Sequence, residues 1–339
     1  MSRETLDTLF HPFNSGALEA AGTGQRALFL GAEPDFRLPE GFAARLSLVQ
    51  GFRPHFRALQ RSNLEVAPQA EGDNYDAALV LCGRHRGENE LRIAEAIART
   101  RQGGLIVVAG GKDEGIASLR KRMADQVAID GHLPKYHGTA FWFRHPADGD
   151  TAAETLRNGA KTDLVEGRFR TAPGMFSHDR IDAGSKLLAN NLPDQLSGRV
   201  ADFCAGWGYL ASEVALRFSK VKALDLYEAD FASLEAAKAN LADVKSPPTR
   251  FFWHDLAGEP VTERYDAIVM NPPFHTGRRA EPELGQTIIK TAIKALKPGG
   301  RLYLVANRQL PYEKTLAGTV SEFAEIAGDR TFKVLVARR

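Results

Sequence analysis

Short apolar runs alternate with amphipathic stretches along the second half of the chain. One amphipathic stretch, residues 229–241, predicts a helix whose apolar face carries Phe231, Leu234, Ala237 and Leu241. The apolar runs predict strands at residues 199–203, 221–227, 251–255 and 265–270. Alternation of strand and helix is typical of a parallel sheet that is covered on both faces, so this half predicts an α/β domain.

The first half of the chain repeats this pattern. The strand predicted at residues 75–80 begins Tyr-Asp-Ala, as does the strand predicted at residues 265–270. Further along each half, a glycine pair opens an apolar strand, at residues 103–109 and again at 299–305, and we expect the glycines to form the turn into the strand. We infer an internal duplication, and the expected fold is two Rossmann-like α/β domains in tandem.

The two copies differ where a ligand would bind. Asn271-Pro272-Pro273-Phe274 follows a strand of the second copy, whereas Leu81-Cys82-Gly83-Arg84 follows the equivalent strand of the first. The loop at residues 28–34 of the first copy keeps one glycine, and Pro34 lacks an amide N–H that a ligand could use. The first copy is therefore expected to have kept the fold and lost its cofactor.

The chain length also fits two domains. At 339 residues the chain is long for one average domain and sufficient for two separate cores. Turn-forming residues place the boundary between Pro146 and Val165, with room for a short helix. We expect residues 1–150 to form the degenerate domain and residues 151–339 the functional one.

Composition says little about nucleic acid. The chain is 43% hydrophobic and 25% charged, as in an ordinary globular protein, and its formal net charge of +2 does not by itself indicate a nucleic-acid-binding protein. Local arginine pairs offer phosphate contacts, although such pairs are more often solvated surface. These pairs are Arg84 with Arg86, Arg168 with Arg170, and Arg278 with Arg279.

Cysteine usage and the N-terminus bear on the compartment. Cys82 and Cys204 are far apart and each follows an apolar run, which indicates neither a disulfide framework nor a metal pair. The N-terminus has acidic residues where a secretory signal needs a basic and then an apolar stretch, and no apolar run is long enough to cross a bilayer. We expect a cytoplasmic protein with no metal and no membrane attachment.

A glycine loop at residues 202–208 supplies the first candidate ligand contacts. The segment ends a strand and opens a helix, and its glycines let the backbone pass close to a ligand at the carboxyl ends of the strands. The candidates are Asp202, Cys204, Ala205, Gly206 and Gly208. Taken alone, this pattern is also typical of a structural turn or of a dinucleotide-binding loop.

Acidic residues follow the next two strands. Glu228 stands about twenty residues after the glycine loop, where a carboxylate can accept both ribose hydroxyl hydrogens of a bound nucleoside. It could instead stabilise a helix N-terminus, as could Asp230, and Asp225 is a weaker candidate because it lies within the strand. Asp255 closes the next strand, where it can accept from an adenine amino group beside apolar neighbours such as Leu256, or serve as a turn residue.

Asn271-Pro272-Pro273-Phe274 indicates the reaction centre, and Asn271 is also expected to contact the cofactor. Two prolines in sequence fix the backbone, so the Asn271 side chain and the Pro272 carbonyl form a rigid pair of acceptors. Such a pair can hold the hydrogens of an exocyclic amino group and turn the nitrogen lone pair toward the methyl of a sulfonium, while Phe274 offers a face for an unstacked base. In combination with the preceding motifs, the pattern favours catalysis over a simple Pro-Pro turn.

Together these residues resemble amino-methyltransferases with an Asn-Pro-Pro-aromatic motif. They resemble more closely the ribosomal RNA small-subunit methyltransferase C family, which are guanine-N2 methyltransferases with duplicated class I methyltransferase domains. The resemblance covers nearly the whole chain, although Ala205 stands where many members have a first glycine and Trp207 is bulky. It implies S-adenosylmethionine as the cofactor and the N2 amine of a guanine in small-subunit ribosomal RNA as the methyl acceptor.

The resemblance also implies contacts outside the motifs described above. Residues 173–185 look like the stretch that precedes the family's first cofactor strand, although a loop and a capped helix would explain them as well. Phe176 and Asp182, with Ser177 and Asp179, would approach the methionine end of the cofactor or the target base. The implied substrate contacts are Asp182, Phe274, His275 and Arg278.

We expect a monomer that acts on ribosomal RNA or on the small ribosomal subunit, with the first domain supporting folding or RNA binding. Three alternatives stay open. A guanine-N2 methyltransferase of large-subunit ribosomal RNA would share every motif. A protein glutamine-amide methyltransferase commonly has tyrosine in place of Phe274 and a small helical first domain. A non-catalytic RNA-binding assembly protein could retain the pocket.

Overall fold

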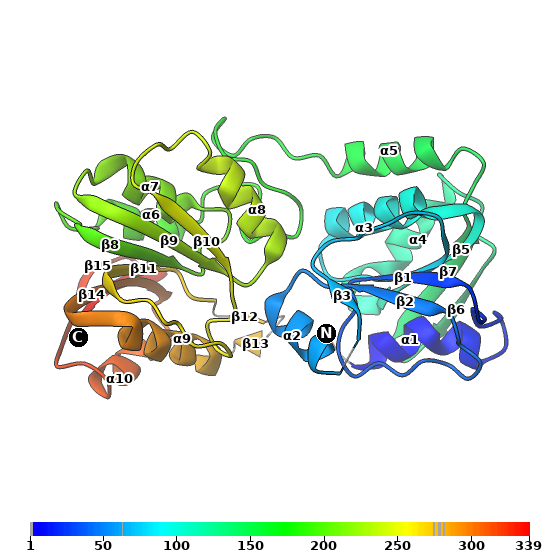
Figure 1. The fold of residues 1–339 in the computed structure, drawn as a ribbon, viewed down its shortest axis with the longest axis horizontal. Helices are drawn as coiled ribbons and strands as arrows, with labels where there is room; N and C mark the ends of the chain where they lie inside the picture. The colour runs from blue at the N-terminus through cyan, green and yellow to red at the C-terminus, as the bar shows by residue number, and fades with distance from the viewer. Residues whose placement is uncertain (1–2, 63, 274, 277–278, 281) are drawn as a thin grey trace. The chain divides into compact units, whose positions relative to one another are not determined.

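The computed structural model describes residues 3–62, 64–273, 275–276, 279–280 and 282–339. The chain divides into two compact units, the first formed by Met1–Thr162 with Ala172–Gly174 and the second by Asp163–Thr171 with Met175–Arg339. Each unit contains a seven-stranded sheet with helices on both faces, as Figure 1 shows. The expected α/β fold, repeated in tandem, is confirmed.

The first unit is built on one mixed sheet. Its strands are β1 (Arg26–Leu30), β2 (Arg45–Val49), β3 (Val66–Ala67), β4 (Tyr75–Leu81), β5 (Thr100–Gly111), β6 (Gly131–Lys135) and β7 (Gly138–Arg144). Its helices are α1 (Arg3–Asn14), α2 (Arg53–Arg61), α3 (Arg86–Arg99), the short 3-10 helix η1 (Lys112–Glu114), α4 (Ile116–Ala124) and α5 (Gly149–Gly159). The strand order is β3-β2-β1-β4-β5-β7-β6, with β7 antiparallel to both of its neighbours and the other pairs parallel.

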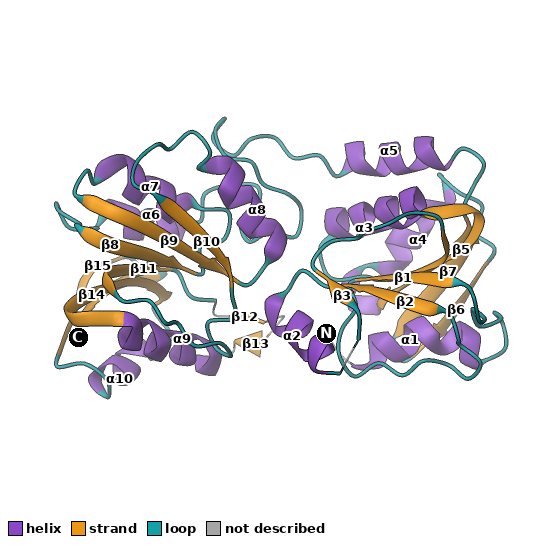
Figure 2. Ribbon diagram, viewed as in Figure 1, coloured by secondary structure: helices purple, strands orange, loops and turns teal. Residues whose placement is uncertain are grey.

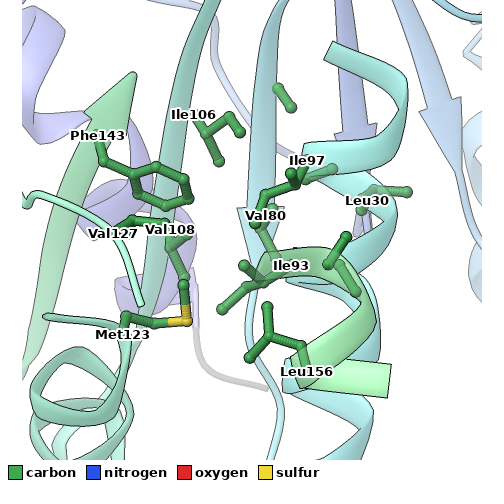
Figure 3. Close-up of a cluster of buried hydrophobic side chains, with 14 of the residues drawn as sticks. Leu30, Val80, Ile93, Ile97, Ile106, Val108, Met123, Val127, Phe143 and Leu156 are labelled. Carbon is green, nitrogen blue, oxygen red and sulfur yellow. The ribbon is translucent and has the colours of Figure 1, made fainter. Parts of the chain in front are cut away.

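Apolar side chains of both sheet faces form the core of the first unit. Helices α3, α4 and α5 cover one face, and α1 and α2 cover the other. Figure 3 shows Ile93 of α3, Met123 of α4 and Leu156 of α5 near the strand residues Val80 and Val108. Because α5 packs on α3, the first unit extends to Thr162, beyond residue 150.

The second unit has the same design. Its strands are β8 (Gly198–Phe203), β9 (Val221–Glu228), β10 (Thr249–Trp253), β11 (Tyr265–Met270), β14 (Leu296–Asn307), β15 (Glu322–Gly328) and β16 (Phe332–Arg338). A separate two-stranded sheet pairs β12 (His275–Thr276) with β13 (Arg279–Ala280) in antiparallel orientation. Its helices are α6 (Ala183–Asn190), α7 (Tyr209–Arg217), α8 (Phe231–Asn240), α9 (Pro282–Ala295) and α10 (Tyr312–Ala317). The sheet order is β10-β9-β8-β11-β14-β16-β15. Helices α6, α7 and α8 cover one face and α9 and α10 the other, as Figure 2 shows.

Strand order and register support the inferred duplication. In each sheet the first strand lies between the second and the fourth, and the last strand but one forms the edge. One difference concerns the loop after the first strand, because β8 leads into α7 whereas residues 31–44, all of them described, contain no helix.

The repeated Tyr-Asp pair performs the same structural task in both units. The carboxylate of Asp76 accepts from the backbone N of Arg26 at 2.9 Å, and that of Asp266 accepts from the backbone N of Arg199 at 2.8 Å. Each arginine side chain lies over the ring of the tyrosine that precedes the aspartate. The guanidinium carbon is 4.5 Å from the ring centroid for Arg26 and Tyr75, and 5.6 Å for Arg199 and Tyr265. The aspartate therefore ties the start of the first strand to the start of the fourth.

The glycine pairs differ from the expectation that they precede a strand. Strand β5 begins at Thr100 and β14 at Leu296, so each pair lies inside its strand, where the register with the neighbouring strand shifts. Gly103 and Gly299 have φ values of 72° and 77°. A Cβ atom on Gly300 would lie 3.0 Å from the carbonyl oxygen of Tyr265, so glycine is needed where the strands approach closely.

Removing the Asp266 carboxylate is expected to destabilise the second unit. Burial alone would raise the pKa of Asp266, but hydrogen bonds from Lys297 and from the Arg199 backbone lower it. The Asp266→Ala variant should lose about 1 kcal/mol of unfolding free energy at pH 7, since most of the partly exposed ion pair is screened. The loss should shrink as pH falls through the lowered pKa, because the wild-type carboxylate is then protonated.

Urea unfolding at several pH values measures this difference. Asp243→Ala, at an exposed position, is the control and should leave the unfolding free energy unchanged. Equal stability of Asp266→Ala and wild type at pH 7 would contradict the structural role of the repeated aspartate.

Candidate active site

The candidate site lies where β8 and β11 end side by side. The two strands are parallel, with Asp202 opposite Val269 and Phe203 opposite Met270, so the residues that follow them emerge at the same edge of the sheet. Of the expected site residues, one cleft at this edge contains Phe176, Asp182, Cys204, Ala205, Gly206 and Asn271. Ser177, Ser185, Trp207, Tyr209 and Leu210 complete its lining.

The glycine loop turns sharply at the floor of the cleft. Cys204 has a φ of 59°, a conformation that non-glycine residues seldom adopt outside constrained sites, and Gly206 has a φ of 54°. A Cβ atom on Gly206 would meet nothing within 4 Å, so the backbone there is open to a ligand. Burial raises the pKa of the Cys204 thiol well above its usual range, which favours the neutral thiol.

Gly208 and Asp202 do not line this cleft, but they support the glycine loop. Gly208 is the N-cap of α7 with a φ of 90°, and a Cβ atom there would lie 2.8 Å from the side chain of Leu241. The fully buried carboxylate of Asp202 accepts from the backbone N of Ala211 at 2.8 Å, in the first turn of α7, and burial raises its pKa well above the usual range. Both residues thus hold the start of α7 against the sheet.

Glu228 joins the glycine loop to the end of the neighbouring strand. Its Oε2 accepts from the backbone N of Gly206 at 2.7 Å, and its Oε1 accepts from the backbone N of Asp230 at 2.8 Å. Burial raises the pKa of Glu228 to about 7. Asp230 itself caps α8 by accepting from Ser233, and Asp225 lies inside β9, bonded to Arg199, Arg250 and Tyr265.

Asp255 and Leu256 lie in the loop that follows β10. The strand ends at Trp253, two residues earlier than expected, and Asp255 Oδ1 accepts from the backbone N atoms of Ala257 and Gly258 at 3.1 and 3.0 Å. Leu256 is buried in the core. Asp255 therefore has the geometry of a turn residue. Its loop starts next to Glu228, because the backbone N of His254 donates to the Glu228 carbonyl at 2.8 Å.

Asn271 is held by the start of α6. Its Nδ2 donates to Oδ2 of Asp182 at 3.0 Å and to Oγ of Ser185 at 2.8 Å. Pro272, the next residue in the chain, is buried. Phe274 and Arg278 lie outside the described residues, and His275 belongs to β12 although its side chain is not described.

Trp207 holds neighbouring residues of the cleft, a role that the sequence analysis did not predict. Its Nε1 donates to the carbonyl of Phe176 at 2.9 Å, and its ring packs against Phe169 with 5.1 Å between centroids. Trp207 is buried, whereas Phe176 is 55% exposed. The indole thus fixes the segment that carries Phe176 over the cleft.

Sequence reasoning missed Ser185, Tyr209 and Leu210 as cleft residues. The spacing Asp182-x-x-Ser185 is a helix-start pattern, and Asp182 does cap α6 by accepting from the backbone N of Ser185 at 2.8 Å. That spacing indicates the cap and gives no sign of the second partner, Asn271, because the contact depends on how α6 packs on the sheet.

The equivalent positions of the first unit lack these groups. By strand register, Gln50 takes the place of Glu228, Ala70 that of Asp255, and Leu81 that of Asn271. Arg92 donates to the Leu81 carbonyl at 2.7 Å and lies against Gly31, where a Cβ atom would be 2.7 Å from its Nη1. Its guanidinium therefore fills the space between the ends of β1 and β4.

No helix among the described residues is long and apolar enough to span a membrane. They also contain no group of three or more His, Cys, Asp or Glu side chains that could hold a metal ion.

Comparison with known proteins identifies the family. The profile of the family described as "Methyltransferase small domain" matches residues 166–336. "Ribosomal RNA small subunit methyltransferase C" of Salmonella arizonae is 30% identical over 332 residues, with 91% of each chain covered, and that of Salmonella paratyphi B is 29% identical with the same coverage.

A solved structure shows the same fold over both units. The Thermus thermophilus 16S rRNA N2 G1207 methyltransferase (RsmC), in complex with AdoMet and guanosine, aligns with a TM-score of 0.78 and 24% identity over 99% of this chain and 91% of that one. The profile match over half of the chain and the 30% identical relative together show that this protein belongs to the methyltransferase small domain family, among the ribosomal RNA small subunit methyltransferases C.

Proposed function

We propose that this protein transfers a methyl group from S-adenosylmethionine to the exocyclic N2 amine of a guanine in small-subunit ribosomal RNA. The observation that carries the proposal is the position of Asn271 in the same cleft as Cys204, Ala205 and Gly206. An acceptor for an amino group thus lies beside the open backbone suited to a cofactor. The names of the relatives support small-subunit RNA as the substrate, and the guanosine bound to the Thermus thermophilus protein supports the base.

The residues of the second unit fit this cofactor. Gly206 leaves room for a ligand against the backbone, and the Glu228 carboxylate at the adjacent strand end suits the two ribose hydroxyls. Asp255 and Leu256 follow the next strand, where they would meet the adenine amino group and ring, and Phe176 would cover the methionine end. When bound, the cofactor supplies an electrophilic methyl group on a sulfonium.

The chain contributes alignment instead of acid or base catalysis. The Asn271 carboxamide and the Pro272 carbonyl would accept the two hydrogens of the substrate amine, which turns the nitrogen lone pair toward the methyl group. Phe274 would offer a face to the unstacked base, with His275 and Arg278 as further contacts. The nitrogen becomes acidic only as it gains the methyl group, so water can remove the proton and no strong base is needed.

We propose that the two units have different functions. The second unit, corresponding to the domain expected at residues 151–339, holds the cofactor and the reaction centre. The first unit, corresponding to residues 1–150, supports folding or RNA binding, because Gln50, Ala70 and Leu81 replace the groups that the chemistry needs.

Methyl transfer from labelled cofactor to small ribosomal subunits and to naked ribosomal RNA, followed by mapping of the modified nucleotide, tests the proposal. Wild type should label a guanine of the small-subunit RNA at N2. Asn271→Ala should lower single-turnover methylation about a hundredfold or more while cofactor affinity stays within about twofold, because the amine is no longer held in the attack line.

Asn158→Ala, at an exposed position on α5, is the control and should methylate at the wild-type rate. Wild-type methylation by Asn271→Ala would refute this reaction centre. Labelling only of large-subunit RNA or of a protein glutamine would show that the proposed substrate is wrong. Cofactor binding without transfer to any of these substrates would refute enzyme function.

Cofactor affinity should depend on pH through Glu228. Burial raises the pKa of this carboxyl group to about 7, and ribose hydroxyls bind its ionised form. Protonation therefore competes with binding, so the association constant should rise about tenfold per pH unit below pH 7 and level off above it. Calorimetry on Glu228→Gln should show a flat profile, whereas Glu235→Gln, on the exposed side of α8, should keep the slope. A wild-type affinity that does not vary between pH 5.5 and 8 would contradict the role of Glu228.

Each chain should bind one cofactor molecule. Loss of a charge-assisted hydrogen bond weakens binding by about 1.5–3 kcal/mol, so Glu228→Ala should reduce affinity roughly ten- to a hundredfold. Gln50→Ala, the equivalent change in the first unit, should leave affinity and stoichiometry unchanged. Calorimetry measures both, and two equal sites per chain would show that the first unit has kept its cofactor.

A further inference from the structure

Both hydrogens of the Asn271 amide nitrogen are already used within the protein. Nδ2 carries two hydrogens, and it has two acceptors, Asp182 Oδ2 at 3.0 Å and Ser185 Oγ at 2.8 Å. The described part of the chain places no donor on Oδ1 of the same side chain. The amide is therefore oriented with its nitrogen toward α6, and its oxygen is the atom left for a ligand in the cleft.

The two acceptors are themselves fixed. Asp182 is the N-cap of α6, with φ −61° and ψ 131°, and its Oδ2 also accepts from the backbone N of Ser185 at 2.8 Å. Ser185 is 8% exposed. A Cβ atom on Gly184 would lie 3.1 Å from the ring of Phe332 in β16, so the first turn of α6 lies close against the sheet.

We propose that Asp182 and Ser185 are positioning residues for methyl transfer, which act through Asn271 by holding its amide with the oxygen toward the substrate amine. The proposal rests on the proposed function, because it assigns the orientation of the reaction-centre residue. A reversed amide would direct its carbonyl oxygen at the Asp182 carboxylate and present hydrogens to the substrate nitrogen, which would bind the lone pair that must attack.

The orientation matters most as the reaction proceeds. The nitrogen lone pair forms the new bond to the methyl carbon while the carbon–sulfur bond breaks, with its electron pair left on sulfur, and the methylated nitrogen then loses one hydrogen as a proton to water. Positive charge grows on the nitrogen during this step, so the N–H bond that faces Asn271 donates more strongly to its Oδ1. The negative charge of Asp182 on the far side of the amide polarises Asn271 in the same sense.

Ser185→Ala removes one acceptor and keeps the backbone N–H that the cap needs. It should lower single-turnover methylation about ten- to a hundredfold, with cofactor affinity and RNA KM within about twofold of wild type. Asp182→Asn keeps a good N-cap residue, so α6 is retained, and it should lower the rate by at least as much because an amide replaces the charged acceptor.

Ser233→Ala is the matched control. Asp230 caps α8 by accepting from the backbone N of Ser233 at 2.8 Å, which repeats the Asp182–Ser185 geometry in the same unit without Asn271. Ser233 is also buried, at 3% exposed. This variant should methylate at the wild-type rate.

A double-mutant cycle separates positioning from general support of the fold. If Ser185 acts through Asn271, then Ser185→Ala should have no further effect in the Asn271→Ala background. The same fold-loss in both backgrounds, a wild-type rate for Ser185→Ala, or weaker cofactor binding with an unchanged saturating rate would overturn the proposal. Failure of the proposed function is distinguishable, because Asn271→Ala itself would then retain the wild-type rate.

Discussion

The parallel pairing of β8 with β11 is the constraint on which the site depends. Phe203 and Met270 are paired near the ends of these strands, so Cys204 and Asn271 leave the sheet next to each other although they are far apart in sequence. The neighbouring strand β9 ends at the same edge and delivers Glu228 to the glycine loop. A parallel sheet with this strand order therefore brings the glycine loop, the Glu228 carboxylate and Asn271 to one edge.

The first unit shows that the scaffold can be kept with different residues at the strand ends. It keeps the strand order and the aspartate anchor of the first strand, which are requirements of folding. It has lost the groups at the strand ends, and Arg92 fills the space between β1 and β4 with an ion pair to Glu88. Gln50 even keeps one contact of its counterpart, since its Oε1 accepts from the backbone N of Phe52 at 2.7 Å, as Glu228 accepts from Asp230. What differs is the set of polar side chains at the strand ends.

Much of the fold was predictable because hydrophobic periodicity reports burial. The strand at residues 265–270 has the expected bounds, and the duplication is visible in the Tyr-Asp pair that anchors both sheets. The glycine pairs were misplaced, because glycine marks a backbone with positive φ or close approach, and a bulge inside a strand satisfies that description as well as a turn does.

The candidate site was less accessible to sequence reasoning, for a physical reason. Residues at strand ends follow from strand order, so Asn271 and Gly206 could be placed in one cleft. Ser185 reaches the site through the packing of α6 on β14 and β16, and Trp207 through a hydrogen bond to the Phe176 carbonyl. Contacts of this kind depend on tertiary packing, which spacing along the chain does not record.

The energetics of Asn271 show why such packing contacts would matter in the proposed reaction, which depends on alignment. A carboxamide has two orientations of nearly equal shape, and only one of them turns its oxygen to the cleft. A hydrogen bond to a charged acceptor contributes about 1.5–3 kcal/mol, and every 1.4 kcal/mol changes a ratio of populations about tenfold. The bond to Asp182 alone would thus favour the productive orientation by roughly ten- to a hundredfold. Leu81, at the equivalent position of the first unit, has no polar side-chain atom to orient, so the first unit has no counterpart of the hydrogen-bonded amide at this position.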